Sequence, residues 1–252
     1  EVFNPYQIGW LVVLISGLSL LGYLALRVFG HRSGIVIAGI LGGMASTTAT
    51  TLVYAKYSKK QAGFSNIAAT IILMSHLVQF VRIGIIVGIL EFTLIPLMLP
   101  WLIGGGVAGS LFILWSYRRI ANSKEPLPAV STRNPAEIIS AAIFAVSFAG
   151  ILFLVAWMND VFADAGVFLV SFLSGLTDID AITVSNVKLV SDNVLDPSIA
   201  VYAIILAFFA NLAFKLGIVF VFADKKLRLP IFAGYLSLAI GILVGVLVNV
   251  YA

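Results

Sequence analysis

The sequence predicts an all-α membrane protein built from two related halves that insert in opposite directions. Hydrophobic residues make up 61% of the chain and charged residues only 10%, a composition that a soluble globular domain does not have. Long apolar stretches recur between short polar breaks, and their polar motifs recur in the same order in both halves. Each half is expected to hold three transmembrane helices and one broken or re-entrant helix. The alternative is eight full spans arranged as two parallel repeats of four.

Eight stretches are long and apolar enough to cross a membrane. A transmembrane helix needs about 20 apolar residues to span a hydrocarbon layer about 30 Å thick. None of the stretches alternates polar and apolar residues as barrel strands do, so their backbone groups must be satisfied within helices. The stretches are approximately residues 6–28, 34–55, 65–90, 99–117, 136–158, 165–188, 199–223 and 229–250.

Glycine and polar motifs match between the two halves. The motif from Gly42 to Thr51 in the second stretch aligns with the motif from Ser174 to Thr183 in the sixth. Other matches follow in the same order at a nearly constant spacing, which indicates an internal duplication. They are Asn4-Pro5 with Asn134-Pro135, Lys56 with Lys188, Arg82 with Lys215, and Leu99-Pro100 with Leu229-Pro230. The predicted units are a first membrane repeat, 1–118, a basic, proline-containing linker loop, 119–135, and a second membrane repeat, 136–252.

The placement of Lys and Arg decides between the two topologies. If every stretch crosses the membrane, the basic residues of the loops divide eight to five between the two sides. If the second and sixth stretches enter and return on the same side, twelve basic residues share one side and Lys188 stands alone on the other. That asymmetry is typical of cytoplasmic loops. Each half then crosses three times, so the halves are inverted, linker 119–135 is cytoplasmic, and both termini lie outside the cell membrane.

Glycines in the second and sixth stretches, Gly42, Gly43 and Gly175, mark the predicted backbone breaks. Half-helices of roughly ten residues are about 15 Å long and reach the middle of the bilayer. Non-helical backbone at that depth is tolerated only beside protein or a water-filled cavity, so paired broken helices indicate a binding site. The alternative is that both stretches are ordinary spans whose glycines let helices pack closely.

Four charged residues lie within apolar stretches: Arg82, Asp178, Asp180 and Lys215. Each costs on the order of 3 kcal/mol at the centre of a membrane helix, so the four must be compensated or solvated. As internal ion pairs they would hold the repeats together. As the lining of a path they would mark a route for ions.

Polar residues at helical spacing accompany these charges. A lone histidine is more often a hydrogen-bonded core residue than a ligand, and hydroxyls in apolar helices usually bond to their own backbone. The density of polar groups nevertheless favours the lining of a path. The predicted path residues are Ser46, Thr47, Thr50, Thr51, Ser75, His76, Gln79, Arg82, Asn211 and Lys215.

The predicted function is transport of a small ion by a carrier or channel, with its site at the repeat interface near the bilayer midplane. A divalent metal cation is the first expectation, because Thr177, Asp178, Asp180 and carbonyls at the break offer the oxygen ligands that such ions prefer. The metal would be the substrate, and no other cofactor is expected. The alternative is an anion transporter that uses Arg82 and Lys215.

A further alternative is a non-transporting membrane scaffold or regulator. Its pairs of small residues would pack helices closely, either within one chain or in a homodimer. The pairs are Gly84 with Gly88, Gly105 with Gly109, and Gly241 with Gly245.

No enzymatic activity is predicted. Two aspartates in a membrane can act as an acid and base pair, but Asp178 and Asp180 lie two positions apart in one segment. Neither a Gly-x-Gly-Asp nor a His-Glu-x-x-His motif occurs. The net charge of +4 reflects loop topology, so the expected partner is the lipid bilayer and not a nucleic acid.

The paired motifs at 42–51 and 174–183 resemble those of an uncharacterised family of integral membrane domains found C-terminal to MgtC/SapB-type membrane domains. The resemblance extends over essentially the whole chain. It implies an upstream MgtC/SapB-type domain as partner and, by association, a link to magnesium or other metal-ion physiology. It does not identify a substrate.

Overall fold

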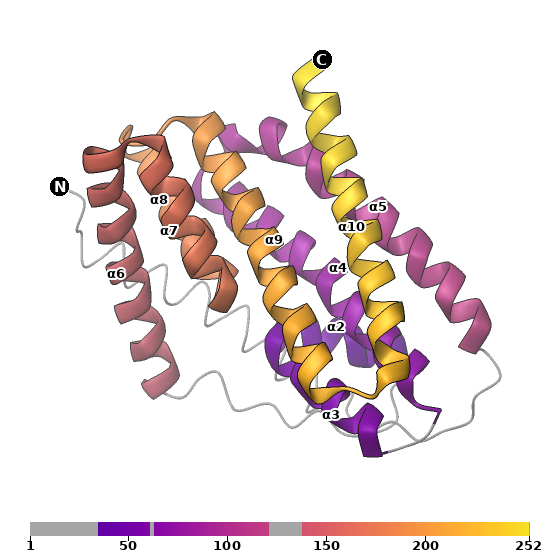
Figure 1. Ribbon diagram of the computed structural model, residues 1–252. Coiled ribbons are helices and arrows are strands. Elements are labelled where there is room, and N and C mark those ends of the chain that lie inside the picture. Colours follow the sequence, from indigo (N-terminus) through magenta and orange to yellow (C-terminus); the bar gives the residue numbers. More distant parts are fainter. Residues whose placement is uncertain (1–34, 61–62, 121–137, 252) are drawn as a thin grey trace. The chain divides into compact units, whose positions relative to one another are not determined.

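Figure 1 shows the computed structural model, which describes residues 35–60, 63–120 and 138–251. This part of the chain is all-helical and contains no strand, which confirms the predicted all-α class; the predicted repeat arrangement stays a prediction. The predicted first span, 6–28, and linker residues 121–135 lie outside the described residues. The elements are α2 (Ile35–Ala45), α3 (Thr47–Lys60), α4 (Ser65–Leu90), η2 (Phe92–Leu94), α5 (Ile95–Ile120), α6 (Ile138–Phe162), α7 (Asp164–Thr177), α8 (Ile179–Ser191), α9 (Pro197–Phe222) and α10 (Lys225–Tyr251).

Within the residues that the structure describes, four segments are long and apolar enough to cross a membrane. They are Ser65–Leu90 in α4, Phe92–Ser116 in η2 and α5, Pro197–Phe222 in α9, and Lys225–Val248 in α10. Large apolar side chains such as Leu111 and Leu247 are exposed on α5 and α10. A helix surface of this kind is stable where lipid and not water surrounds it. The protein is therefore a membrane protein.

The second and sixth predicted stretches are each broken into two helices. Ser46 separates α2 from α3, and Asp178, in extended conformation with φ −145° and ψ 117°, separates α7 from α8. The predicted positions of the breaks were wrong by a few residues, because Gly42 and Gly43 lie within α2 and Gly175 lies within α7. The breaks fall instead on residues whose side chains cap a following helix.

The glycines serve close packing. A Cβ atom on Gly43 would lie 2.6 Å from the carbonyl oxygen of Ser75 in α4. A Cβ atom on Gly175 would lie 2.5 Å from the carbonyl oxygen of Ala207 in α9. Both separations are too short for any residue with a side chain, so each broken helix approaches its long helix through a glycine.

The described residues form two compact units. Unit 1 comprises residues 83–99 and 138–214, and unit 2 comprises residues 35–82, 100–120 and 215–251. Helices α6, α7 and α8 therefore belong to unit 1, and α2, α3 and α10 belong to unit 2. By these ranges, α4, α5 and α9 each contribute residues to both units.

In unit 1, α7 and α8 form a helical hairpin. Both helices pack against α6. The Asn159 side-chain amide, near the end of α6, donates to the Val194 carbonyl oxygen at 3.5 Å. Because α7 follows α6 and Val194 follows α8, this contact brings the start of α7 and the end of α8 to the same end of the unit, as the ribbon shows (Figure 1).

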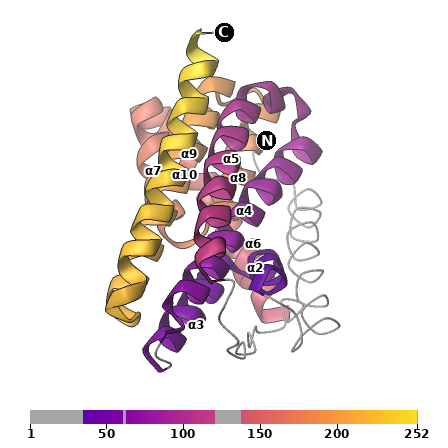
Figure 2. The same ribbon diagram turned by 90° about the vertical axis from the view of Figure 1, so that its right-hand side faces the viewer.

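In unit 2, the break between α2 and α3 is a sharp change of direction. Figure 2 shows α2 almost end-on while α3 runs along the plane of the picture. The last turn of α3 meets the end of α9, where the Lys59 ammonium donates to the Val221 carbonyl oxygen at 3.2 Å. Further along α9, Lys215 reaches Gln79 of α4. Since α4 begins just after α3, the two contacts show that α4 and the end of α9 run antiparallel.

Helices α5 and α10 also run antiparallel in unit 2. A Cβ atom on Gly104 would lie 2.2 Å from the Gly241 carbonyl oxygen. One turn further along α5, the Ser237 hydroxyl donates to the Ala108 carbonyl oxygen at 3.0 Å. Gly105 and Gly109 likewise face Phe80, Ile242 and Leu238. These small residues are therefore used for packing within the chain.

Two pairs of helices begin at the same fixed interval along the sequence. Helices α3 and α8 begin 132 residues apart (179 minus 47), as do α4 and α9 (197 minus 65). The glycine contacts on Ser75 and Ala207 keep the same interval. At this interval, Gln79 and Asn211 occupy corresponding positions in the two halves of the sequence. Arg82 and Lys215 are one residue out of register, which corresponds to a rotation of about 100° around the helix.

Candidate functional site

Lys215 is the centre of a buried polar cluster in unit 2. Its side chain is fully buried in α9, with an exposed fraction of 0%. The ammonium donates to the Thr47 hydroxyl at 2.6 Å and to the Gln79 side-chain oxygen at 3.2 Å. A buried cation is stable only when polar groups replace its hydration shell. Unit 2 supplies two of these groups, one from α3 and one from α4.

The lysine meets α3 at its first residue, Thr47. The Ser46 hydroxyl caps this helix by accepting from the Ala49 amide at 3.2 Å. The first turn of a helix carries partial positive charge, because its amide groups lack partners within the helix. The Lys215 ammonium therefore lies beside an electropositive helix end.

Arg82 meets the other side of the same break. Its guanidinium donates to the carbonyl oxygen of Met44, in the last turn of α2, at 3.4 Å. The end of a helix carries partial negative charge, so a cation is favoured at this position. The two cations therefore have different effects at the break. Arg82 satisfies a carbonyl group at the end of α2, whereas Lys215 adds positive charge at the start of α3.

His76 is buried on α4, one turn before Gln79. Its Nδ1 lies 2.8 Å from the Ile72 carbonyl oxygen, so Nδ1 carries the proton and Nε2 is an acceptor. Nε2 is buried and has no hydrogen-bond partner among the described residues. The ring packs 4.9 Å from the Tyr235 ring of α10. The contacts are those of a core histidine with one unused acceptor.

Most of the predicted hydroxyl groups bond to their own helices. The Ser75 hydroxyl donates to the Ile72 carbonyl oxygen at 2.7 Å. The Thr50 and Thr51 hydroxyls donate to the carbonyl oxygens one turn earlier, each at 2.8 Å. Such bonds are the usual state of hydroxyls in apolar helices. Among the threonines predicted to line the path, Thr47 contacts Lys215.

The break in unit 1 has a different set of groups. The Asp178 carboxylate accepts from the Asp180 backbone amide at 2.8 Å and so caps α8. Asn211, on α9, donates from its side-chain amide to the Gly175 carbonyl oxygen at 2.8 Å. Asp178 and Asp180 are half-buried, and Thr177 is exposed and donates to its own helix. This break therefore presents carboxylates where the other presents cations.

The proposed metal ligands do not gather into a conventional metal centre. Among the residues that the structure describes, no three Asp, Glu or His groups lie close enough to hold a metal ion together. A metal at this position would need hydroxyl or carbonyl ligands beside Asp178 and Asp180. The assignment of Thr177, Asp178 and Asp180 to metal binding remains a prediction.

Three contributors to the polar interior were not singled out from the sequence. Asn186 of α8 donates to the Ser171 hydroxyl of α7 at 3.1 Å, and both side chains are buried. Their signal was available, since a polar residue on each of two apolar half-helices indicates a contact between them. Tyr235, which packs on His76, gave no signal, because tyrosine is ordinary in an apolar helix.

Comparison with known proteins identifies the family and no function. Residues 13–223 match the family described as "Domain of unknown function (DUF4010)". An uncharacterised protein of Aquifex aeolicus (strain VF5) is 29% identical over 199 residues, which cover 77% of this chain and 85% of that protein. No solved structure matches. Because the match spans most of the chain, including both broken helices, the protein belongs to the DUF4010 family.

Proposed function

We propose that this protein is a membrane transporter of small ions and that Lys215 is the central charge of its binding site. The observation that carries this proposal is the fully buried ammonium held between Thr47 and Gln79 at the start of a broken helix. Charges inside membrane helices are expensive and usually serve ion routes. Broken helices in corresponding positions of two repeats are a recurrent feature of transporter sites.

The two repeats are proposed to be inverted, and α4 and α9 support this arrangement. They occupy corresponding places in the sequence, since both are 26 residues long and begin at the fixed interval. They run antiparallel where they meet in unit 2, which two parallel repeats would not produce. Basic residues also collect at one end of that unit, where α3 ends, α10 begins and α5 ends; we assign this end to the cytoplasm, with both termini outside.

A labelling experiment tests the inversion. Cysteines in place of His31 and Lys59 should react with a membrane-impermeant reagent from the same side of the membrane, because both flank a segment that enters and returns. Labelling from opposite sides would establish a complete crossing and reject the re-entrant arrangement.

A small anion is the substrate that unit 2 supports best. Lys215, the first turn of α3 and Arg82 each contribute positive potential at the break, and positive potential favours an anion over a divalent cation. The Thr47 hydroxyl and the lysine are both groups that can donate a hydrogen bond to an anion. Half-helix starts that point at anionic groups are known from transporters of other folds.

A divalent cation is the second candidate, and one observation favours it. Asp178 and Asp180 are both half-buried and lie at the break in unit 1, and carboxylate oxygens are ligands that divalent cations prefer. The cap that Asp178 forms occupies one carboxylate oxygen, Oδ1. A cation site there would fit the expected association with an MgtC/SapB-type domain.

Flux measurements distinguish these functions. Purified protein in liposomes is assayed for uptake of chloride, nitrate, inorganic phosphate, Mg²⁺ and Mn²⁺, together with the variants Lys215→Met and Asp178→Asn. Anion uptake that Lys215→Met abolishes and Asp178→Asn leaves in place supports the proposal. Metal uptake with the opposite sensitivity selects the second candidate. No uptake of any ion by folded protein rejects transport and favours a scaffold or regulator, for which a homodimer remains a proposal.

A further inference from the structure

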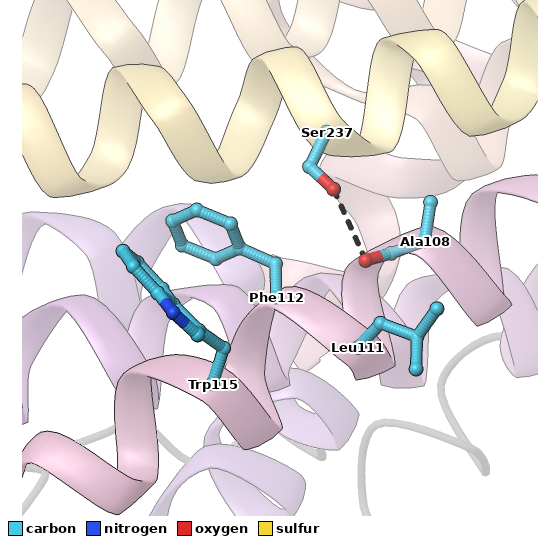
Figure 3. A pocket seen from close by; sticks show the side chains of 5 residues that line it. All are labelled: Ala108, Leu111, Phe112, Trp115 and Ser237. Carbon is cyan, nitrogen blue, oxygen red and sulfur yellow. Dashed lines mark hydrogen bonds between the residues drawn. The ribbon is translucent and has the colours of Figure 1, made fainter.

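An apolar groove runs between α5 and α10 in unit 2 (Figure 3). Its volume is about 410 Å³. The Ser237 hydroxyl at its edge donates to the Ala108 carbonyl oxygen, so these two polar groups of the walls satisfy each other. Leu111 and Trp115 are 62% and 53% exposed, which makes the groove accessible from outside the chain. The residues that line it are Ala108, Leu111, Phe112, Trp115 and Ser237.

Basic residues lie at one end of this groove. Arg118 and Arg119 occupy the last turn of α5, three and four residues after Trp115. Helix α10 begins with Lys225 and Lys226, which are exposed. Because the two helices run antiparallel, the last turn of α5 and the first turn of α10 lie at the same end of the pair (Figure 1). The structure therefore combines an apolar groove with a cluster of positive charge beyond one end.

The distance from the far end of the groove to the basic residues matches part of a lipid chain. Ser237 lies eleven residues after Lys226, and Ala108 lies ten residues before Arg118. At about 1.5 Å per residue, both separations are about 15 Å. Half of a membrane's hydrocarbon layer has the same depth. An extended acyl chain can thus run along the groove while its headgroup reaches the basic residues.

We propose that this groove binds one acyl chain of an anionic phospholipid, whose phosphate lies at the basic end of α5 and α10. The apolar walls select a hydrocarbon chain, and the charge selects an anionic headgroup over a zwitterionic one. Each basic residue near a membrane surface contributes about 1 kcal/mol to attraction of anionic lipid, so a preference of about tenfold or more is expected. The proposal does not depend on ion transport.

Trp115 provides a direct readout. A variant that retains only this tryptophan, with Trp10, Trp101 and Trp157 changed to phenylalanine, is reconstituted in phosphatidylcholine vesicles. A small fraction of the lipid is brominated phosphatidylglycerol or, at the same fraction, brominated phosphatidylcholine. Bromine quenches nearby tryptophan fluorescence, so site occupancy is read as quenching. A matched protein that retains only Trp157, which is also half-exposed, reports on unselective lipid.

The proposal expects several-fold stronger quenching of Trp115 by the brominated anionic lipid, with no such preference at Trp157. Replacing Lys225, Lys226, Arg118 and Arg119 with glutamine should remove the preference, and Ala108→Leu, which fills the groove, should reduce quenching by both lipids. Equal quenching by the two lipids at Trp115 overturns the proposal. Weak quenching that decreases further at high protein-to-lipid ratio also overturns it, because a second copy of the chain then covers the groove.

Discussion

The two broken helices of this protein share a geometry and differ in charge. In each, a glycine packs against the backbone of a long helix, and the break follows within three residues. In unit 2 the break is capped by Ser46 and carries Lys215 at the start of α3. In unit 1 the break is capped by Asp178 and is held by Asn211. A shared packing geometry has therefore been combined with positive groups at one break and negative groups at the other.

The close glycine contacts that both broken helices share should be the sites most sensitive to mutation. Gly43→Ala and Gly175→Ala each place a methyl group about 2.5 Å from a backbone oxygen, and each is expected to lower the free energy of unfolding by about 3 kcal/mol. Thermal unfolding in detergent measures the loss. Gly106→Ala and Gly217→Ala, where nothing lies within 4 Å of the added atom, are the controls and should be neutral or stabilising. Equal tolerance at all four glycines would show that the close approach is not required.

The amides at corresponding positions should differ in their effects. Asn211→Leu removes the donor to the buried Gly175 carbonyl oxygen and is expected to cost about 2 kcal/mol of stability. Gln79→Leu removes an acceptor from Lys215, so its main effect should appear in ion flux. Thermal unfolding and liposome flux on both variants separate the roles. A Gln79→Leu protein with unchanged flux and reduced stability would assign a purely structural role to this residue.

The acidic cap can be separated from its charge. Asp178→Ala removes the cap of α8 and should cost about 1 kcal/mol, whereas Asp178→Asn retains an acceptor and should cost less. Unfolding temperatures of the two variants test the cap. If Asp178 also binds a divalent cation, stabilisation by Mg²⁺ should be lost in both variants, and equal stabilisation of all three proteins would reject that role.

The smallest effect is expected outside the two breaks, at the start of α9. Asp196 is exposed and accepts from the Ser198 hydroxyl at 2.5 Å, which together with backbone amides lowers the pKa of its carboxyl group. A lowered pKa in the folded state stabilises the fold above the unfolded-state pKa of about 3.9 and ceases to do so as the pH falls through the folded value. Asp196→Ala should therefore unfold slightly earlier than the wild type at pH 7. The difference should shrink below about pH 4, and a difference that grows in acid would contradict this account.

Composition and spacing predicted the helices well, because membrane insertion constrains length and polarity directly. The broken stretches were predicted from Gly43 and Gly175, yet the breaks fall at Ser46 and Asp178. A glycine signals either flexibility or close approach, and the sequence alone does not distinguish the two. Capping residues in the same motif were the better indicator of where a helix restarts.

The candidate site was only partly predictable. Lys215, Gln79 and Thr47 were selected because polar residues are costly in an apolar helix, and the structure brings these three together. Thr50, Thr51 and Ser75 were selected by the same argument but bond to their own helices. Whether a hydroxyl bonds to its own helix or to another side chain depends on its distance from the helix end. That distance could be known only once the exact location of the break was known.

The most direct test of the account is whether Lys215 meets the transported ion. Protein labelled with ¹⁵N-lysine in detergent gives a side-chain resonance for this residue, which Lys215→Met identifies by its absence. The account predicts a saturable shift of that resonance on addition of the anion that crosses liposomes, with weaker binding in Thr47→Val. A resonance that stays in place while the same anion is transported at full rate would contradict it.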